Sequence, residues 1–302
     1  MAGVRTFGAA TLADALAAKR GRTISVCIPC RDEAGTISSL LTAICHELVG
    51  PDGFVDELLV IDDRSTDGTA AVAARAGARV VPIESIHAEH GVGWGKGNAL
   101  WAGMLASRGD VVVFLDGDLT SFAADWVVSL AMPLLQDDSV ALVKAHAHRP
   151  TTMGGGGRTT ELVARPLISL YFPELAGLQQ PLAGEYAVRR SVVERLSFVQ
   201  GWGVEIALLI DIARRHGAEA IAQVDVGVRE HRHRPLQSLA VQAAEVAATA
   251  LGRAGVLAEQ PAVLRRPDGS ELVLNVWERP PLAGVQEVSD TSCTGDVRDD
   301  AV

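Results

Sequence analysis

Short apolar segments alternate with amphipathic segments along the first part of the chain, and this alternation limits the fold more than any other feature of the sequence. The apolar segments have the length of strands and lie at residues 23–30, 57–63, 78–83 and 110–115. Strands that are apolar along their whole length are buried on both faces, which is typical of a parallel sheet with helices on either side. The sequence therefore predicts an α/β fold built on a mostly parallel sheet.

The expected helices of this part lie before and between those strands, at residues 9–19, 36–48, 67–76 and 96–107. The second part of the chain predicts strands at 141–148 and 220–228 and helices at 158–170, 204–216 and 236–251. We expect an N-terminal helical segment (1–20), two halves of one compact unit (21–150 and 151–286) and a polar, acidic, disordered tail (287–302).

The composition narrows the class of protein. The chain has 302 residues, of which 48% are hydrophobic, enough for one large domain with appendages or two small domains. Its net charge of −10 argues against general nucleic-acid binding, which needs a basic face. The sequence contains no apolar run near the ~20 residues of a membrane span and no signal-peptide pattern, so we expect a cytoplasmic protein.

The four cysteines form no disulfide framework, as expected in a reducing compartment. Cys27 and Cys30 make a C-x-x-C pair, which could indicate a redox or zinc site. They lie at the end of an expected strand, and no second pair follows to complete a zinc site. We therefore interpret them as packing residues.

Charged residues follow the expected strands at the point where each strand ends. They are Arg31, Asp32, Asp62, Asp63, Asp116 and Asp118. Because open α/β sheets bind ligands at the carboxyl ends of their strands, we expect a binding site at this edge.

The triplet Asp116-Gly117-Asp118 is the clearest part of that site. A glycine between two carboxylates lets the backbone bend so that both oxygens point toward one place. Mg²⁺ and Mn²⁺ prefer oxygen ligands of this kind, beside substrate phosphates. The alternative is a solvated turn, but the position after a buried strand favours a metal site.

A second group of residues indicates a site for anions. The glycine run 154–157 precedes Arg158 and Thr160 at an expected helix start, where free N–H groups, a guanidinium and a hydroxyl come together. The alternative is a flexible linker. The run 229–234 places three arginines and two histidines in six residues of an acidic chain, which also favours negatively charged ligands.

Two single residues allow two interpretations each. His231 could complete the coordination of a cation held by aspartate, or it could be a surface histidine. Glu205 lies in an apolar stretch, where a charge is costly unless it is paired. Its partner is a sugar hydroxyl or a buried salt bridge, and we favour the sugar.

The motifs together resemble those of GT-A glycosyltransferases, in which a D-x-D motif holds the metal and the donor pyrophosphate. Besides residues 116–118, they are residues 29–33 (PCRDE), 60–69 (VIDDRSTDGT) and 95–99 (GKGNA). Four segments resemble the glucosyl-3-phosphoglycerate synthases of actinobacteria more closely: 155–167, 181–190, 201–211 and 226–235. The resemblance implies a retaining enzyme, active as a homodimer with Mg²⁺ or Mn²⁺, that transfers glucose from UDP-glucose to 3-phosphoglycerate.

The resemblance also implies a role for each residue that matches a motif. The nucleoside pocket would contain Pro29, Cys30, Arg31, Glu33, Asp63 and Lys96. The rest of the donor would contact Asp116, Gly117, Trp202, Gly203, Val204, Glu205, Arg229 and Arg234. The metal would bind Asp118 and His231, and the acceptor would bind Gly157, Arg158, Thr160 and His233. Catalysis would depend on Asp118, Glu205 and Arg158.

The chain differs from the family pattern at Asp63, where the family has serine, and at His233, where it has asparagine. The carboxylate of Asp63 can accept a hydrogen bond from an N–H of the donor base, and His233 lies among the residues expected near the acceptor. The alternatives left open are GDP-mannose as donor, another small acidic acceptor, and an inactive nucleotide-sugar-binding protein. A nucleotidyltransferase is disfavoured because the first loop has no glycine-rich signature.

Overall fold

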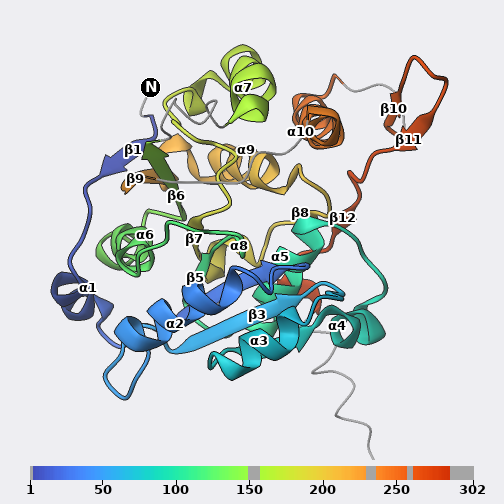
Figure 1. Ribbon diagram of the computed structural model, residues 1–302. Helices are drawn as coiled ribbons and strands as arrows, with labels where there is room; N and C mark the ends of the chain where they lie inside the picture. Colours follow the sequence, from blue (N-terminus) through green and yellow to red (C-terminus); the bar gives the residue numbers. More distant parts are fainter. Residues whose placement is uncertain (1–2, 149–156, 229–235, 257–260, 286–302) are drawn as a thin grey trace, which may run out of the picture.

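The centre of the molecule is an eight-stranded sheet (Figure 1). The computed structural model describes residues 3–148, 157–228, 236–256 and 261–285. The strand order is β1-β9-β6-β7-β5-β2-β3-β4, and one sheet therefore draws on both halves of the sequence. Strand β7 runs antiparallel to both of its neighbours, and every other pair in this sheet is parallel. The prediction of a mostly parallel α/β fold is confirmed.

All the strands predicted from apolar runs are present. They are β2 (Ile24–Cys30), β3 (Glu57–Asp62), β4 (Arg79–Pro82), β5 (Val111–Phe114), β6 (Leu142–His148) and β9 (Ile221–Val228). The sequence patterns missed β1 (Arg5–Phe7) and β7 (Tyr186–Arg189). Strands of three and four residues are too short to show a period, so their pairing partners define them.

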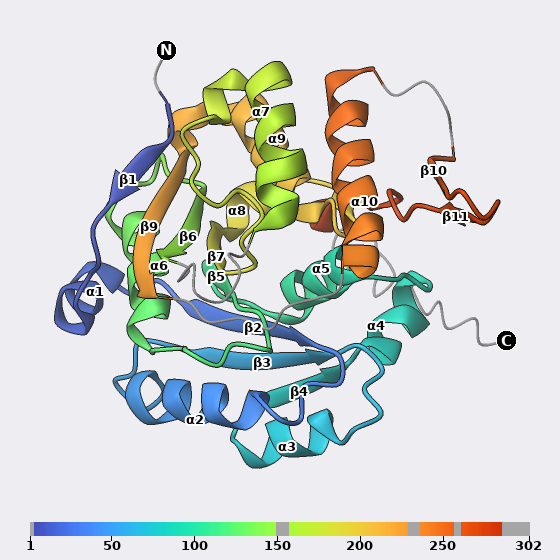
Figure 2. The ribbon, with the colours of Figure 1, turned by 45° about the horizontal axis from the view of Figure 1, so that its top comes forward.

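Helices cover both faces of the sheet (Figure 2). One face carries α1 (Leu12–Lys19), α2 (Ile37–Leu48), α3 (Thr69–Arg75) and α6 (Asp125–Gln136). The other carries α4 (Ile83–His90), α5 (Lys96–Ala106), α7 (Arg165–Tyr171), α9 (Val204–His216) and α10 (Leu236–Ala254). The short α8 (Arg190–Val193) follows β7 directly.

Most of the predicted helices are present with small shifts at their ends. The sequence patterns missed α4, because the apolar run before it was assigned to the strand as far as Ile83, whereas β4 ends at Pro82. The helix predicted at 158–170 begins with a π-helical turn, Thr160–Ala164, before α7. Within the described residues no helix is long and apolar enough to cross a bilayer. The predicted tail, 287–302, lies outside the described residues.

Smaller elements close the second half. The strands β8 (Phe198–Val199) and β12 (Glu278–Arg279) form an antiparallel pair that joins the C-terminal segment to the body. A hairpin of β10 (Val263–Arg265) and β11 (Glu271–Val273) projects beyond α10 (Figure 1).

The direction of β7 matters for the site. Phe114 at the end of β5 pairs with Tyr186 at the start of β7. The chain entering β7 therefore lies at the same edge as the residues that leave β5, β2 and β3. Segments from residues 30, 62, 116 and 185 meet at one edge of the sheet.

Helix α5 packs very closely on the chain after β8. A Cβ added at Gly97 would lie 1.8 Å from the carbonyl oxygen of Val199. A Cβ added at Gly252, in α10, would meet nothing within 4 Å.

We expect Gly97→Ala to lower the free energy of unfolding by about 1–3 kcal/mol, because the alanine Cβ would clash with the Val199 carbonyl and force the backbone to shift. Gly252→Ala is the matched control and should raise it by about 0.5–1 kcal/mol, since alanine restricts the unfolded chain and favours helix. Urea unfolding of the two variants and the parent tests the pair. Equal stability of Gly97→Ala and the parent would contradict the close packing.

Candidate active site

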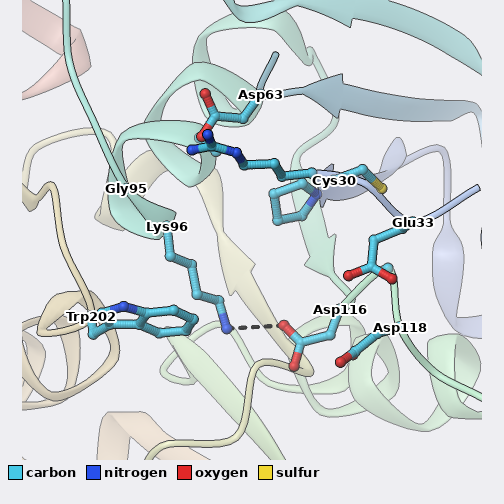
Figure 3. Close-up of a pocket in the computed structure, with 12 residues that line it drawn as sticks. Cys30, Glu33, Asp63, Gly95, Lys96, Asp116, Asp118 and Trp202 are labelled. Atoms are coloured by element: carbon cyan, nitrogen blue, oxygen red, sulfur yellow. Dashed lines mark hydrogen bonds and ion pairs between the residues drawn. The ribbon is translucent and has the colours of Figure 1, made fainter. Parts of the chain in front are cut away.

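A cleft of about 410 Å³ opens at the carboxyl ends of β2, β3 and β5 (Figure 3). Its lining includes nearly all the residues predicted for the donor site in the first half of the chain. It is formed by Pro29, Cys30, Arg31, Glu33, Asp63, Gly95, Lys96, Ala99, Asp116, Gly117, Asp118 and Trp202. Figure 3 shows Asp63 at one end of the cleft and Asp116 and Asp118 at the other.

The loops after β2 and β3 are joined by hydrogen bonds. The backbone N–H of Asp32 donates to Ser65 Oγ at 3.0 Å, and Thr66 N–H donates to Asp32 Oδ1 at 2.7 Å. Glu33 N–H donates to Thr69 Oγ1 at 2.8 Å. These bonds hold the two loops as one wall of the cleft, with Arg31 and Glu33 on its inner side.

The turn after β5 is fixed by close packing on Cys30. A Cβ at Gly117 would lie 2.8 Å from Cys30 Sγ, and Thr36 Oγ1 donates to the Gly117 carbonyl at 2.8 Å. Burial, together with nearby carboxylates such as Glu33, raises the pKa of the Cys30 thiol far above its usual value. Cys27 and Cys30 are both buried free thiols, so the interpretation as packing residues agrees with the structure.

Lys96 connects three elements at the centre of the site. Its Nζ lies 2.9 Å from Asp116 Oδ1, at the end of β5, and 2.8 Å from Glu205 Oε1, in the first turn of α9. Burial opposes the charge on Lys96, but the carboxylates of Asp116 and Glu205 outweigh it and hold the pKa of the ammonium above its usual value. Of the two partners considered for Glu205, this structure shows the buried salt bridge.

The segment that enters β7 forms the floor beneath Asp116. A Cβ at Gly184 would lie 2.1 Å from Asp116 Oδ1, so only glycine allows this approach. Lys144, on β6, is 2% exposed and donates from Nζ to the Ala183 carbonyl. Its Nζ also lies 4.5 Å from the centre of the Tyr186 ring.

The turn before α9 is held from α10. Glu245, which is buried, accepts the N–H of Trp202 at 2.8 Å and the N–H of Asn275 at 3.1 Å. The neighbouring Gly203 packs on Thr249, because a Cβ there would lie 2.0 Å from Thr249 Oγ1. Trp202 therefore lines the cleft from a turn whose backbone is bound at a fixed place.

The donor set at the end of β5 fits a divalent cation. Asp116 and Asp118 lie on either side of Gly117, and Figure 3 shows Glu33 beside them. The two carboxylates of Asp116 and Asp118 suit Mg²⁺ or Mn²⁺, which take further ligands from phosphates and water. The described residues contain no cluster of three or more His, Cys, Asp or Glu side chains placed to bind a metal. His231, which was predicted to bind the metal together with Asp118, lies outside them.

The predicted acceptor residues are only partly described. Gly157 has a φ of +84° and accepts the N–H of Glu161 at 2.8 Å, at the start of the helical turn. Thr160 is buried and Arg158 is partly buried. The predicted residues Arg229, His233 and Arg234 and the glycines 154–156 lie outside the described residues.

The structure brings together most of the predicted donor residues and adds others that the sequence patterns missed. Gly203, Val204 and Glu205 lie behind the cleft at the start of α9 and are absent from its lining. Lys144 was missed, although a lysine inside the apolar strand β6 was a usable signal. Glu245 carried no signal, because acidic residues are common in helices.

Comparisons with known proteins show the family of the chain. The family model of glycosyl transferase family 2 matches residues 25–196. The glucosyl-3-phosphoglycerate synthase of Mycolicibacterium paratuberculosis is 45% identical over 294 residues, covering 91% of this chain and 88% of the relative. That of Petrotoga mobilis is 42% identical and covers 78% and 74%.

Solved structures give the same result. Glucosyl-3-phosphoglycerate synthase from Mycobacterium tuberculosis, in complex with Mn²⁺, UDP-glucose and phosphoglyceric acid, has a TM-score of 0.86 and 42% identity, and the match covers 93% of this chain and 99% of that one. A second complex of that enzyme contains Mn²⁺, UDP and glucosyl-3-phosphoglycerate, with a TM-score of 0.85.

The buried Lys144 generates a prediction about stability. Burial lowers its pKa from 10.5 to about 8, an effect that the nearby carboxylate of Glu205 partly offsets. Between pH 8 and pH 10.5 Lys144 is protonated in the unfolded chain but not in the folded chain, so the free energy of unfolding rises with pH in this range. Below pH 8 Lys144 is charged in both states, and the free-energy cost of burying its charge is fully present.

We therefore expect Lys144→Met to raise the free energy of unfolding at pH 7 by about 2 kcal/mol. Removing the buried charge should contribute about 3 kcal/mol, and losing the hydrogen bond to the Ala183 carbonyl should cost about 1 kcal/mol. The gain should disappear as the pH approaches 10.5, which serves as the internal control. Denaturant unfolding at several pH values measures it, and a gain that does not depend on pH would contradict the buried charge.

Proposed function

The chain belongs to glycosyl transferase family 2 and, within it, to the glucosyl-3-phosphoglycerate synthases, and we propose that the cleft at the end of β5 is its active site. The protein is a metal-dependent enzyme that transfers glucose from UDP-glucose to 3-phosphoglycerate and forms glucosyl-3-phosphoglycerate. The observation that carries the assignment of the site is that Lys96, which lines this cleft, joins Asp116 in the cleft to Glu205 behind it.

The metal site that we propose uses Asp118, with Asp116 beside it and His231 as a further ligand. When bound, the ion neutralises charge that builds up on the departing diphosphate. Lys96 supplies a second, permanent positive charge next to Asp116. Its ion pairs keep that charge in place in a partly enclosed cleft, where it acts on the donor more strongly than it would in water.

Glu205 would orient the donor sugar. Its side chain is 4% exposed and is held by Lys96 at the start of α9, and a carboxylate held in this way can accept a hydrogen bond from a sugar hydroxyl. We infer that transfer occurs with retention, the acceptor hydroxyl attacking from the face that the diphosphate leaves. Because Glu205 is already paired with Lys96, we assign no covalent nucleophile.

The acceptor would bind where the helical turn begins at Gly157. Backbone N–H groups at a helix start and the guanidinium of Arg158 suit a phosphate or a carboxylate. Thr160 and His233 would complete this site, and Arg229 and Arg234 would contact the donor.

We also propose a homodimer in the cytoplasm. Leu162 and Leu170 are 72% and 73% exposed on the π-helical turn and α7, which supports a protein contact there. The described cysteines are free thiols, which suits a reducing compartment. Light scattering of the purified chain measures the oligomeric state.

Metal removal tests the first part of the proposal. EDTA should abolish transfer, and Mg²⁺ or Mn²⁺ should restore it. Asp118→Ala should lower kcat/KM about a hundredfold or more, because the ion supplies several kcal/mol of charge stabilisation. Asp52→Ala, at an exposed aspartate in a loop, is the control and should be unaffected. Full activity in EDTA would remove the metal from the mechanism.

A second test concerns the acceptor. Arg158→Ala should raise the KM for 3-phosphoglycerate about ten- to a hundredfold, because a lost charged hydrogen bond costs about 1.5–3 kcal/mol. The affinity for UDP, measured by calorimetry, should stay near that of the parent. Arg165→Ala is the control on the same helix, since Arg165 pairs with Glu161 at 2.8 Å. Glycerate serving as well as 3-phosphoglycerate would overturn the acceptor assignment.

A further inference from the structure

The carboxylate at the base end of the cleft is held by its sequence neighbour. Arg64 donates from Nε and Nη2 to the same atom, Asp63 Oδ1, at 2.8 and 2.5 Å. The guanidinium carbon of Arg64 lies 3.9 Å from the centre of the Trp94 ring. We call these three side chains the base clamp. Arg64 stacks on Trp94 and binds Asp63, and Asp63 faces the cleft.

The backbone of the clamp is arranged for this contact. Arg64 has a φ of +61°, an unfavourable conformation for a residue with a side chain, and it persists only where surrounding contacts enforce it. The Trp94 side chain is 57% exposed, but its backbone is held on both sides. The backbone N–H of Trp94 donates to Gln200 Oε1 at 3.1 Å, and its backbone carbonyl accepts from Asn275 Nδ2 at 2.6 Å. An exposed tryptophan on a backbone held from both sides offers a fixed surface.

The bonding leaves one oxygen of Asp63 for a ligand. Both donors of Arg64 bind Oδ1, and among the described residues none donates a hydrogen bond to Oδ2. Asp63 lines the cleft and is itself buried. A carboxylate accepts hydrogen bonds and cannot donate them.

An acceptor that cannot donate separates the nucleobases by chemistry. Uracil has an N–H at N3 and guanine has one at N1, and either can donate to a carboxylate. Adenine at N1 and cytosine at N3 carry a lone pair instead, which a carboxylate facing that ring nitrogen repels, and only the exocyclic amino groups of these two bases can donate. A serine hydroxyl could serve both kinds of base, because it both donates and accepts.

We propose that Arg64 and Trp94 are positioning residues that hold Asp63 as an acceptor-only reader of the donor base, and that they restrict the donor to nucleotide sugars whose base presents a ring N–H. The inference rests on the proposed location of the nucleoside in this cleft. The clamp also joins the two ends of the site, because Trp94 lies two residues before Lys96.

The test compares the kcat/KM of the full chain for UDP-glucose, GDP-glucose, ADP-glucose and CDP-glucose, with 3-phosphoglycerate as acceptor. The parent should prefer UDP-glucose over ADP-glucose by about a hundredfold or more, since a buried polar group left facing a like group is strongly unfavourable. Asp63→Asn, whose amide both donates and accepts, should reduce this ratio about tenfold or more.

Variants of the other two residues separate positioning from folding. Arg64→Ala and Trp94→Ala should reduce the ratio of UDP-glucose to ADP-glucose and raise the KM for UDP-glucose more than they lower kcat. Trp94→Phe should restore part of the ratio, because it keeps an aromatic platform. Arg5→Ala is the matched control: Arg5 stacks on Phe7 at 5.1 Å on the edge strand β1, and its loss should not change the ratio.

The outcomes are distinguishable. If the parent uses ADP-glucose as well as UDP-glucose, or if Arg64→Ala and Trp94→Ala lower activity equally for all four donors, the clamp does not select the base. If no donor supports transfer to 3-phosphoglycerate, the proposed function fails instead. Calorimetry with UDP and ADP then tests the clamp independently: unequal binding that Asp63→Asn equalises supports it, and equal binding overturns it.

Discussion

The ion pairs of Lys96 with Asp116 and Glu205 set the relative positions of three elements. The end of β5, the start of α5 and the start of α9 each supply one charge, and none of these charges can be buried alone without a large loss of solvation. Moving any one element would leave a charge in the interior without its partner. The arrangement of the central sheet and its two covering helices is therefore tied to the geometry of the site.

Close backbone approach makes this network possible. Glycines at 97, 117 and 184 let α5, the turn after β5 and the segment before β7 come nearer than any side chain would allow. At Gly184 the segment before β7 packs directly on Asp116, and Lys144 fixes this segment by a hydrogen bond to the Ala183 carbonyl. Lys96 in the lining of the cleft and Lys144 behind it thus bring two positive charges to the proposed donor site, in a chain whose net charge is −10.

The two ends of the cleft are built differently. The metal end depends on contacts between residues far apart in the sequence, and its charges are enclosed. At the base end, Asp63 and Arg64 are neighbours, but their orientation depends on Trp94 and on the distant residues that fix its backbone. A nucleotide sugar bound along the cleft would place its base beside Asp63 and its diphosphate beside the charged groups of Lys96 and Asp116.

The sequence by itself determined the α/β class, and it predicted the edge of the sheet that carries the proposed site and most of the residues that line its cleft. Strands buried on both faces must be apolar throughout, and parallel strands bring their carboxyl ends to one edge, so local composition is sufficient for these inferences. Only the tertiary structure decided that β7 enters the sheet antiparallel, that Glu205 pairs with Lys96, and that Trp94 supports Arg64. These contacts join segments distant in the chain, and they depend on crossovers and close packing that no local pattern encodes.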